Sequence, residues 1–315
     1  MRIVIVGAGM AGLACAEGLQ GHGHTILVMD KGRGPGGRMS TRRLDTAAGP
    51  TTFDHGAQYF TVRDPEFGMR VVAWAAKGVV APWAAAGSDA FVGVPAMNAP
   101  IREMAKAFPV QWGVQVETLS PNREGWQLGD KSGEEAQADA VVVALPAEQS
   151  AQLIGHAAPG LATAARSTPS APCWTLMLAF DRPLSTPMNC HRGGKDDALG
   201  WVARNGSKPG RTGPEAWVLQ AGAEWSKQNL EADAEWVARE LLGAFEVLLG
   251  LELPVPTASS AHRWRYARSG SNGSGALWDN ARNLGVCGDW LIGPRVEAAW
   301  MSGTMMAKQI LKVSR

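Results

Sequence analysis

The chain has 315 residues, of which 45% are hydrophobic and 19% charged, and its formal net charge is +1. This length suits two closely packed domains, and a charge this close to zero does not indicate a nucleic-acid or membrane partner. No apolar run approaches the roughly 20 residues that cross a bilayer. The four cysteines form no CxxC pair, so we expect reduced thiols, no metal site and a soluble cytoplasmic protein.

The first 30 residues have the pattern of a β-α-β unit. A short apolar run, Arg2–Val6, is followed directly by a glycine-rich turn, which is typical of a buried parallel strand. Met10–Leu19 follows as a predicted helix that ends at Gly21, and Thr25–Asp30 is the next predicted strand.

Two helices and three strands are predicted between residues 64 and 145. Asp64 and Pro65 are typical of a helix start, and that helix should run to about Lys77. The remaining elements are a helix over Asn98–Phe108 and strands over Gly113–Leu119, Trp126–Leu128 and Ala140–Leu145.

The middle of the chain has longer strands separated by loops rich in Gly, Pro and Ser. This pattern predicts an antiparallel sheet with one covering helix, Ala232–Leu249. The predicted strands are Cys173–Phe180, Leu199–Ala203, Trp217–Ala221 and Thr257–Trp264. A buried strand over Leu284–Cys287 and a helix over Val296–Leu311 close the chain.

The turn Gly7–Gly12 has the spacing of a dinucleotide-binding loop. Gly7 allows a tight turn after the strand, Gly9 lets a diphosphate approach the backbone, and Gly12 lets helix and strand pack closely. The helix N-terminus then faces the phosphates, and Asp30 at the end of the second strand can accept hydrogen bonds from a ribose. The alternative, a glycine-rich turn without a ligand, does not explain the position of Asp30.

A second glycine-rich segment, residues 31–38, follows Asp30 directly. It contains Lys31 and ends in Gly36-Gly37-Arg38, which can place a guanidinium on phosphate oxygens. A flexible, solvated surface loop is the alternative. We favour phosphate binding because the segment leaves the sheet beside the ribose-binding carboxylate.

These motifs resemble the flavin-containing amine oxidase superfamily. The resemblance rests on Gly7–Gly12, Asp30, Gly36–Met39 and Gly288-Asp289, and it covers essentially the whole chain. The segments 30–38, 53–60, 205–211 and 262–266 are most similar to bacterial renalase-like proteins. The resemblance implies a Rossmann-like FAD-binding domain, class α/β, with an inserted α+β substrate domain built on an antiparallel sheet. The expected limits are 1–60, 96–160 and 270–315 for the FAD domain, and 61–95 and 161–269 for the substrate domain.

The resemblance also implies where FAD binds. Arg38 and its neighbours would approach the phosphates, residues 55–58 would run close to the flavin, and Asp289 would lie near the ribityl or diphosphate part. The helix beginning at Val296 would point its dipole at the reduced ring. The expected cofactor-binding residues are Gly7, Gly9, Met10, Ala11, Gly12, Asp30, Lys31, Gly37, Arg38, Met39, His55, Gly56, Ala57, Gln58, Val116, Gly288, Asp289, Val296 and Glu297. His55 alone is more typical of a structural histidine than of a catalyst, and Glu297 could instead favour the helix dipole.

Two departures from monoamine oxidases bear on the chemistry. Cys287 lies in an apolar strand and does not match their flavin-linking cysteine, so we expect non-covalent FAD. Only two tyrosines, Tyr59 and Tyr266, are available for an aromatic pair around an amine. Simple amine oxidation is therefore disfavoured.

The renalase resemblance implies an oxidase acting on isomeric dihydro-NAD(P), reduced at the 2- or 6-position. The products would be NAD(P)+ and, after reoxidation by dioxygen, hydrogen peroxide, and the role would be metabolite repair. A flat substrate needs an aromatic slot rather than an acid–base triad, and His262, Trp264 and Tyr266 alternate on one face of a strand, opposite Arg263 and Arg265. The expected substrate-binding residues are Trp201, Asn205, His262, Trp264 and Tyr266, with core packing as the alternative for each.

Three questions stay open at this point. Lys208 and Arg211 either meet the nucleotide phosphates or belong to a solvated loop. An amine or amino-acid oxidase, with Arg263 or Arg295 binding a carboxylate, is the first alternative function. A flavin-binding protein without turnover is the second.

Overall fold

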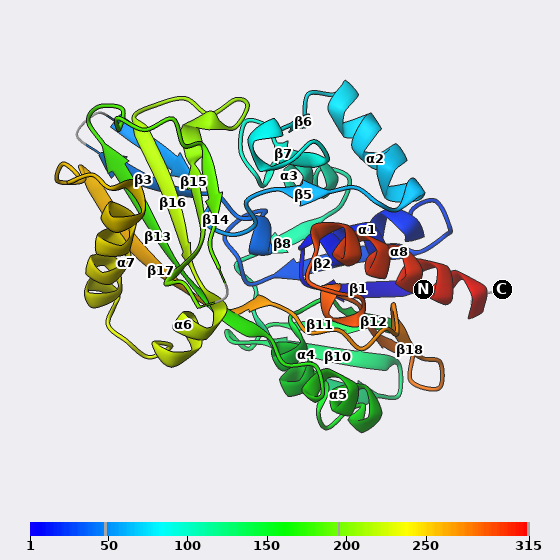
Figure 1. Cartoon of the computed structure of the whole chain (residues 1–315). Helices are drawn as coiled ribbons and strands as arrows, with labels where there is room; N and C mark the ends of the chain where they lie inside the picture. The colour runs from blue at the N-terminus through cyan, green and yellow to red at the C-terminus, as the bar shows by residue number, and fades with distance from the viewer. Residues whose placement is uncertain (47–48, 195, 314–315) are drawn as a thin grey trace.

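Strands from both ends of the chain form one six-stranded sheet, in the order β18-β19-β12-β1-β2-β8 (Figure 1). The computed structural model describes residues 1–46, 49–194 and 196–313. The strands are β18 (Leu277–Asp279), β19 (Leu284–Val286), β12 (Ala140–Val143), β1 (Arg2–Val6), β2 (Thr25–Asp30) and β8 (Val110–Trp112). All neighbours are parallel except β18, which is antiparallel to β19. The strand ends that bind dinucleotides in such sheets therefore come from distant parts of the sequence.

Alternate residues of β1 enter two different cores, because successive side chains of a strand point to opposite faces. Ile3 and Ile5 pack with α1 (Met10–Leu19) and α8 (Val296–Val313). Val4 and Val6 pack on the other face with α4 (Ala147–Ile154), α5 (Pro159–Arg166) and a three-stranded sheet. That sheet has the order β11 (Glu135–Ala138), β10 (Gly125–Asp130), β9 (Val116–Asn122). Both faces of the central sheet are thus covered, as a parallel sheet requires.

Helices α1 and α8 lie side by side and are nearly in backbone contact (Figure 1). A Cβ added to Gly303 would lie 2.0 Å from the carbonyl oxygen of Ala11, and one added to Gly18 would lie 2.6 Å from the Cβ of Ala307. Glycine is required at both positions by this close approach. The C-terminal helix is thereby fixed against the helix that follows the first glycine-rich turn.

A second, antiparallel sheet occupies the other half of the molecule. Its order is β14 (Cys190–Arg192), β15 (Leu199–Arg204), β16 (Glu215–Ala221), β13 (Ala171–Phe180), β17 (Ala258–Arg268). Helix α7 (Ala234–Leu249) covers one face, where Val237, Leu241 and Phe245 pack on β13 and β16. The opposite face meets β4 and contributes to the cavity described below.

Smaller elements connect the two sheets. They are β3 (Arg42–Thr46), β4 (Gly49–Phe53), β5 (Phe60–Thr61), α2 (Pro65–Ala76), β6 (Val80–Pro82), β7 (Ala90–Gly93), α3 (Ala99–Ala105), α6 (Ala223–Gln228) and the 3-10 turns η1 (Gly37–Met39), η2 (Ala84–Ala86), η3 (Asn205–Ser207) and η4 (Asp289–Leu291). The expected division assigns residues 61–95 to the substrate domain, but Phe67, Trp74 and Val92 share a core with Ile3 and Leu13. The domain limits remain a prediction.

The fold class is confirmed: a Rossmann-like sheet combined with an antiparallel sheet. The predicted helix start at Asp64 is also confirmed, since its side chain accepts a hydrogen bond from the Phe67 amide. The strand predicted over Gly113–Leu119 corresponds to β9, but it begins three residues later, at Val116. Gly113 adopts φ +78°, so the chain turns there between β8 and β9. Helices α4 and α5 are rich in alanine and were not predicted.

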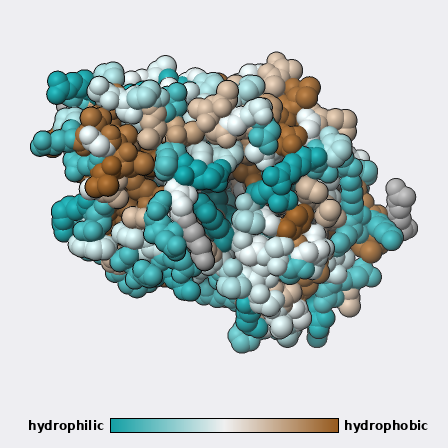
Figure 2. All heavy atoms as spheres, viewed as in Figure 1, coloured by the Kyte–Doolittle hydropathy of each residue, from teal (hydrophilic) through white to brown (hydrophobic). Residues whose placement is uncertain are grey.

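Among the described residues, the four most exposed large apolar side chains lie on two helices or shortly after one of them. Val247 is on α7 and Val255 follows it, whereas Met69 and Val72 are on α2. In Figure 2 most of the visible face is hydrophilic or neutral, with brown atoms gathered in separate places. Within the described ranges, no helix combines the length and the apolar character that a bilayer span needs.

We predict that Gly303→Ala lowers the free energy of unfolding by about 3 kcal/mol, because its Cβ overlaps the Ala11 carbonyl. The matched control is Gly243→Ala in α7, where an added Cβ meets nothing within 4 Å. That change should stabilise the protein by roughly 0.5–1 kcal/mol. Urea unfolding of both variants is the measurement, and equal effects would contradict the packing argument.

Candidate active site

A large cavity lies between the two sheets. It has a volume of about 2090 Å³ and is bordered by the first glycine-rich turn, residues 29–41 and 56–63, β9, β17 and the start of α8. All the predicted cofactor-binding residues except Gly12, His55 and Glu297 border it. Those that do are Gly7, Gly9, Met10, Ala11, Asp30, Lys31, Gly37, Arg38, Met39, Gly56, Ala57, Gln58, Val116, Gly288, Asp289 and Val296. Residues scattered from position 7 to 296 thus meet at one cavity.

In the first glycine-rich turn, Gly9 has free space where a side chain would begin, whereas Gly7 and Gly12 do not. A Cβ at Gly7 would lie 2.5 Å from the Ala144 carbonyl oxygen, and one at Gly12 would lie 1.9 Å from that of Gly7. A Cβ at Gly9 would meet nothing within 4 Å, and Gly9 borders the cavity. Gly7 and Gly12 therefore serve packing, while Gly9 leaves space at the N-terminus of α1 for a ligand to reach the backbone.

Asp30 is held by two backbone amides at the end of β2. Its Oδ2 accepts a hydrogen bond from Ala8 N at 2.7 Å, and its Oδ1 accepts one from Gly32 N at 2.6 Å. A carboxylate has about four lone-pair sites, so it can still accept from a ribose hydroxyl. The carboxylate therefore ties the first glycine-rich turn to the second.

Arg38 joins the N-terminal and C-terminal parts of the site. Its Nη2 lies 2.6 Å from Asp289 Oδ1, across 251 positions of sequence. Its Nη1 is buried and has no hydrogen-bond partner among the described residues. A buried donor without a partner is costly, and a phosphate oxygen would satisfy it. The open turn at Gly9, the carboxylate of Asp30 and this free donor fit the diphosphate and ribose of FAD.

Gly56 is packed against the backbone of Arg38. An added Cβ would lie 2.1 Å from the Arg38 carbonyl oxygen, which also accepts a hydrogen bond from Ala57 N at 2.8 Å. The Asp-His-Gly-Ala-Gln segment, residues 54–58, is thereby fixed beside the phosphate-site arginine.

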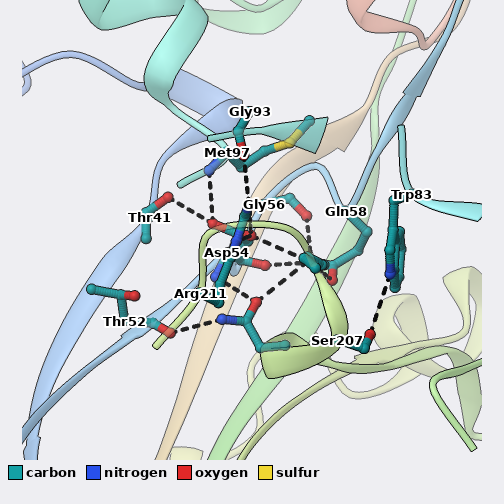
Figure 3. Close-up of polar contacts among 12 residues, drawn as sticks. Thr41, Thr52, Asp54, Gly56, Gln58, Trp83, Gly93, Met97, Ser207 and Arg211 are labelled. Atoms are coloured by element: carbon teal, nitrogen blue, oxygen red, sulfur yellow. Dashed lines mark hydrogen bonds and ion pairs between the residues drawn. The ribbon is translucent and has the colours of Figure 1, made fainter. Parts of the chain in front are cut away.

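Asp54 anchors this segment in a buried ionic cluster that the sequence did not predict. Its side chain accepts from Thr41 Oγ1 at 2.8 Å and from Met97 N at 2.9 Å, and Arg211 Nη2 lies 2.5 Å from Oδ2 (Figure 3). Lys208 Nζ lies 3.3 Å from Asp54 Oδ2. Burial would raise the pKa of Asp54, but the charges of Lys208 and Arg211 lower it to about 2.

The side chains of Lys208 and Arg211 do not lie in a solvated loop, and they do not reach the cavity in which a nucleotide would bind. Both side chains are almost completely buried, and neither residue borders the cavity. Burial lowers the pKa of Lys208 to about 8. Its Nζ donates to Gln58 Oε1 at 3.1 Å, and Gln58 Nε2 donates to the carbonyl oxygens of Gly56 and Asp54. The amide of Gln58 is thus occupied by internal hydrogen bonds.

Asn205 belongs to the same buried cluster. Its Nδ2 donates to Thr52 O at 2.9 Å, and its Oδ1 accepts from Asp54 N at 3.4 Å. Asn205 does not border the cavity, so the prediction that it contacts substrate is wrong. Sequence spacing alone does not distinguish an asparagine that is hydrogen-bonded inside the protein from one that contacts a substrate.

The aromatic residues of β17 border the cavity as predicted. His262, Trp264 and Tyr266 all do so, whereas the guanidinium groups of Arg263 and Arg265 pair with Glu231. The ring centroids of His262 and Trp264 are 4.7 Å apart. Trp201 on β15 also borders the cavity. The two sheets therefore enclose a space that has glycine-rich turns on one side and aromatic rings on the other.

His55 lies beneath this aromatic wall rather than in the cavity. Its backbone oxygen accepts a hydrogen bond from Trp264 Nε1 at 2.9 Å, and its ring centroid is 5.0 Å from that of Trp264. Burial, together with the adjacent His262, lowers the pKa of His55 to about 4. His55 is consequently a neutral packing residue at neutral pH.

Glu297 also has a structural role. Its Oε1 accepts hydrogen bonds from Arg63 N at 2.6 Å and Asp64 N at 2.7 Å, and it does not border the cavity. The predicted cofactor contact of Glu297 is therefore wrong. The carboxylate instead ties the start of α8 to the segment that precedes α2.

Positive charge dominates the cavity. The bordering basic residues are Lys31, Arg33, Arg38, Arg63, Arg102, Arg192, Arg263, Arg265, Arg268 and Arg295, and the acidic ones are Asp30, Glu117 and Asp289. Arg263 and Arg265 pair with Glu231, and Arg295 lies 3.8 Å from Glu297; setting these three aside, seven basic residues and three acidic ones border the cavity. The whole chain has a net charge of only +1, so the site concentrates positive charge. Such a cavity favours anionic ligands.

Comparisons with known proteins match this architecture. A model of the NAD(P)-binding Rossmann-like domain matches residues 5–83, and a model of flavin-containing amine oxidoreductases matches residues 79–311. Cyclohexylamine oxidase from Brevibacterium oxydans IH-35A has a similar fold, with a TM-score of 0.71 and 15% identity over 100% of this chain and 99% of that one. A putrescine oxidase variant gives a TM-score of 0.75 at 13% identity, covering 99% and 98% of the two chains.

A short stretch is also similar to a curated sequence. An L-amino-acid oxidase of Daboia russelii is 54% identical over 42 residues, which are 13% of this chain and 8% of that protein. The chain therefore matches only a small part of that relative's length. The cofactor of the protein described here is FAD.

We predict that Gly9→Val weakens FAD binding by about 10- to 100-fold, because the side chain fills the space at the turn. The apoprotein should keep its free energy of unfolding, since the added Cβ meets no protein atom within 4 Å. Gly160→Val, which also meets nothing within 4 Å but lies outside this cavity, is the matched control. Fluorescence titration of the apoprotein with FAD is the measurement. Unchanged affinity in Gly9→Val would contradict the assignment.

We predict that Asp54→Asn lowers the free energy of unfolding by about 3 kcal/mol, because Lys208 and Arg211 lose their buried counterion. The stability contributed by this carboxylate is present above its ordinary pKa of 3.8 and is lost as the pH falls toward about 2. In urea unfolding at several pH values, the free energy of unfolding of Asp54→Asn should lack the decrease that protonation of Asp54 causes in the wild type below about pH 4. The exposed Asp181→Asn is the control and should change stability by less than about 0.5 kcal/mol; equal effects of the two changes would refute the cluster's role.

Proposed function

Since the chain belongs to the flavin-containing amine oxidoreductase family, we propose that it is an FAD-dependent oxidase of isomeric dihydro-NAD(P). The substrate would be the 2- or 6-dihydro form, and the product NAD(P)+. FAD, when bound, would supply the hydride acceptor, and dioxygen, with one proton, would take the two electrons and the hydrogen to give hydrogen peroxide. We propose that the role is metabolite repair in the cytoplasm.

The observation that carries the proposal is the charge of the cavity. Seven basic residues against three carboxylates exceed what the diphosphate of FAD alone would neutralise. A nicotinamide nucleotide brings further phosphates, whereas an alkylamine is a cation at neutral pH and would be repelled. The charge therefore favours a nucleotide over an amine.

The chemistry of the side chains in the cavity supports the same substrate. Oxidation of a dihydropyridine to a pyridinium breaks one C–H bond as hydride and removes no proton, so no general base is needed. The histidine at the wall, His262, has a pKa lowered by burial, and Trp264 beside it is a flat apolar surface. These residues would orient a planar ring and exclude water rather than transfer protons.

We propose that FAD is bound without a covalent link. Cys287 is completely buried and does not border the cavity, and burial raises the pKa of its thiol to about 12. A thiol this reluctant to ionise is a poor nucleophile toward a flavin. We expect denaturation to release FAD, and flavin that stays attached to the unfolded chain would contradict non-covalent binding.

An amino-acid oxidase is the second candidate. Its support is the 42-residue similarity to an L-amino-acid oxidase, together with Arg295, which borders the cavity at the start of α8. Arg263 was the other arginine considered for binding the carboxylate of an amino acid. Its guanidinium already donates hydrogen bonds to Glu231 and to the carbonyl oxygen of Leu230. Tyr59 and Tyr266 both border the cavity, but Tyr59 packs on Trp201 and Trp83.

We predict that anaerobic mixing with 2- or 6-dihydro-NAD(P) promptly bleaches the oxidised-flavin absorbance. Ordinary NAD(P)H, amines and amino acids should reduce the flavin much more slowly. Stopped-flow absorbance is the measurement, followed by detection of hydrogen peroxide when air is admitted. Bleaching by an amino acid instead would establish the second candidate, and an oxidised flavin with every donor would indicate a protein without turnover.

A further inference from the structure

Arg192 presents a guanidinium to the cavity from the edge of the five-stranded sheet. It is the last residue of β14 and pairs in register with Trp201 on β15. Its guanidinium carbon lies 5.2 Å from the centre of the Trp201 ring, and its Nη2 donates to the hydroxyl of Tyr59. All three residues border the cavity. The guanidinium is therefore held in place by an aromatic face and a phenol.

The charge of Arg192 has no carboxylate partner among the described residues, unlike several other arginines of the cavity. Arg38 pairs with Asp289, and Arg263 and Arg265 pair with Glu231. Tyr59 engages one nitrogen of Arg192, and an arginine has five N–H donors. Donors therefore remain for a ligand with several oxygen acceptors.

The position of Arg192 separates it from the phosphate site of FAD. Gly9 follows β1 of the six-stranded sheet, and Arg38 lies in η1, which follows β2 of the same sheet. Arg192 belongs to the five-stranded sheet, where it contacts Trp201 and Tyr59. The guanidinium groups of Arg38 and Arg192 are therefore positioned by different sheets.

We propose that Arg192 binds the diphosphate of the nicotinamide nucleotide substrate and determines the preference for phosphorylated over unphosphorylated dihydropyridines. This inference rests on the proposed function. A planar guanidinium can contact two phosphate oxygens at once, and Trp201 and Tyr59 keep it in one orientation. The aromatic wall would then bind the ring, and Arg192 would bind the anionic remainder of the substrate.

The test compares Arg192→Met and Arg192→Lys with the wild type, all loaded with FAD. The probes are the 2- or 6-dihydro dinucleotide and the matching dihydronicotinamide riboside, which has no phosphate. The first readout is the dissociation constant of each probe, from the concentration dependence of anaerobic flavin reduction. The second is equilibrium binding of NAD+ or NADP+, followed by the change in flavin absorbance.

We predict that Arg192→Met lowers the ratio of dinucleotide to riboside affinity by about 5- to 20-fold, because a charged and partly solvated hydrogen bond is lost. Arg192→Lys should retain part of the preference, since it keeps the charge but not the planar fork. The matched control is Arg239→Met on the exposed face of α7, which should leave the ratio unchanged.

The outcomes separate this inference from the proposed function. If neither isomer reduces the wild-type flavin, the proposed function fails and the inference fails with it. If the wild type is reduced but Arg192→Met keeps the affinity ratio, the inference alone is overturned. A loss of FAD affinity in Arg192→Met with an unchanged ratio would assign this arginine to the cofactor and would also overturn it.

Discussion

The crossing of α1 and α8 is the contact on which the rest of the structure depends. Gly303 allows α8 to approach the backbone of Ala11, so the last helix of the chain lies against the first. The segment before α8 then places Asp289 at Arg38, and Val296, the first residue of α8, borders the cavity. Without this close approach, the diphosphate site and the wall formed by the C-terminal segment would not belong to one cavity.

The buried cluster around Asp54 makes the corresponding connection to the antiparallel sheet. Lys208 and Arg211 follow β15, and their charges are compensated by a carboxylate that lies next to the cavity-lining segment 56–58. A buried ion pair adds little stability by itself but is costly to break. The main effect of this buried ion pair is to hold Gly56 and Gln58 in place between the phosphate site and the aromatic wall.

Sequence patterns predicted the parts of the site that depend on local backbone geometry. The turn Gly7–Gly12, Asp30 and the alternation along β17 have fixed spacing, and the structure brings them to one cavity. Asn205 and Glu297 were misassigned, and Lys208 was left open between two alternatives. A polar side chain near a glycine has the same sequence pattern whether it is paired internally or free to bind a ligand. Arg192 was missed because its role depends on its neighbours in space, Tyr59 and Trp201, of which Tyr59 lies 133 positions away. Long-range pairing of this kind leaves no mark in a single sequence.

We propose that the cavity accepts a second anionic nucleotide beside FAD. A crystal structure of the FAD-loaded protein soaked with NADP+ tests it most directly. We expect the diphosphate of FAD at Gly9 and Arg38, and the pyridine ring of NADP+ against Trp264 with its phosphates toward Arg192. A nucleotide bound elsewhere, or FAD whose diphosphate occupies the wall formed by Arg192, would contradict the account.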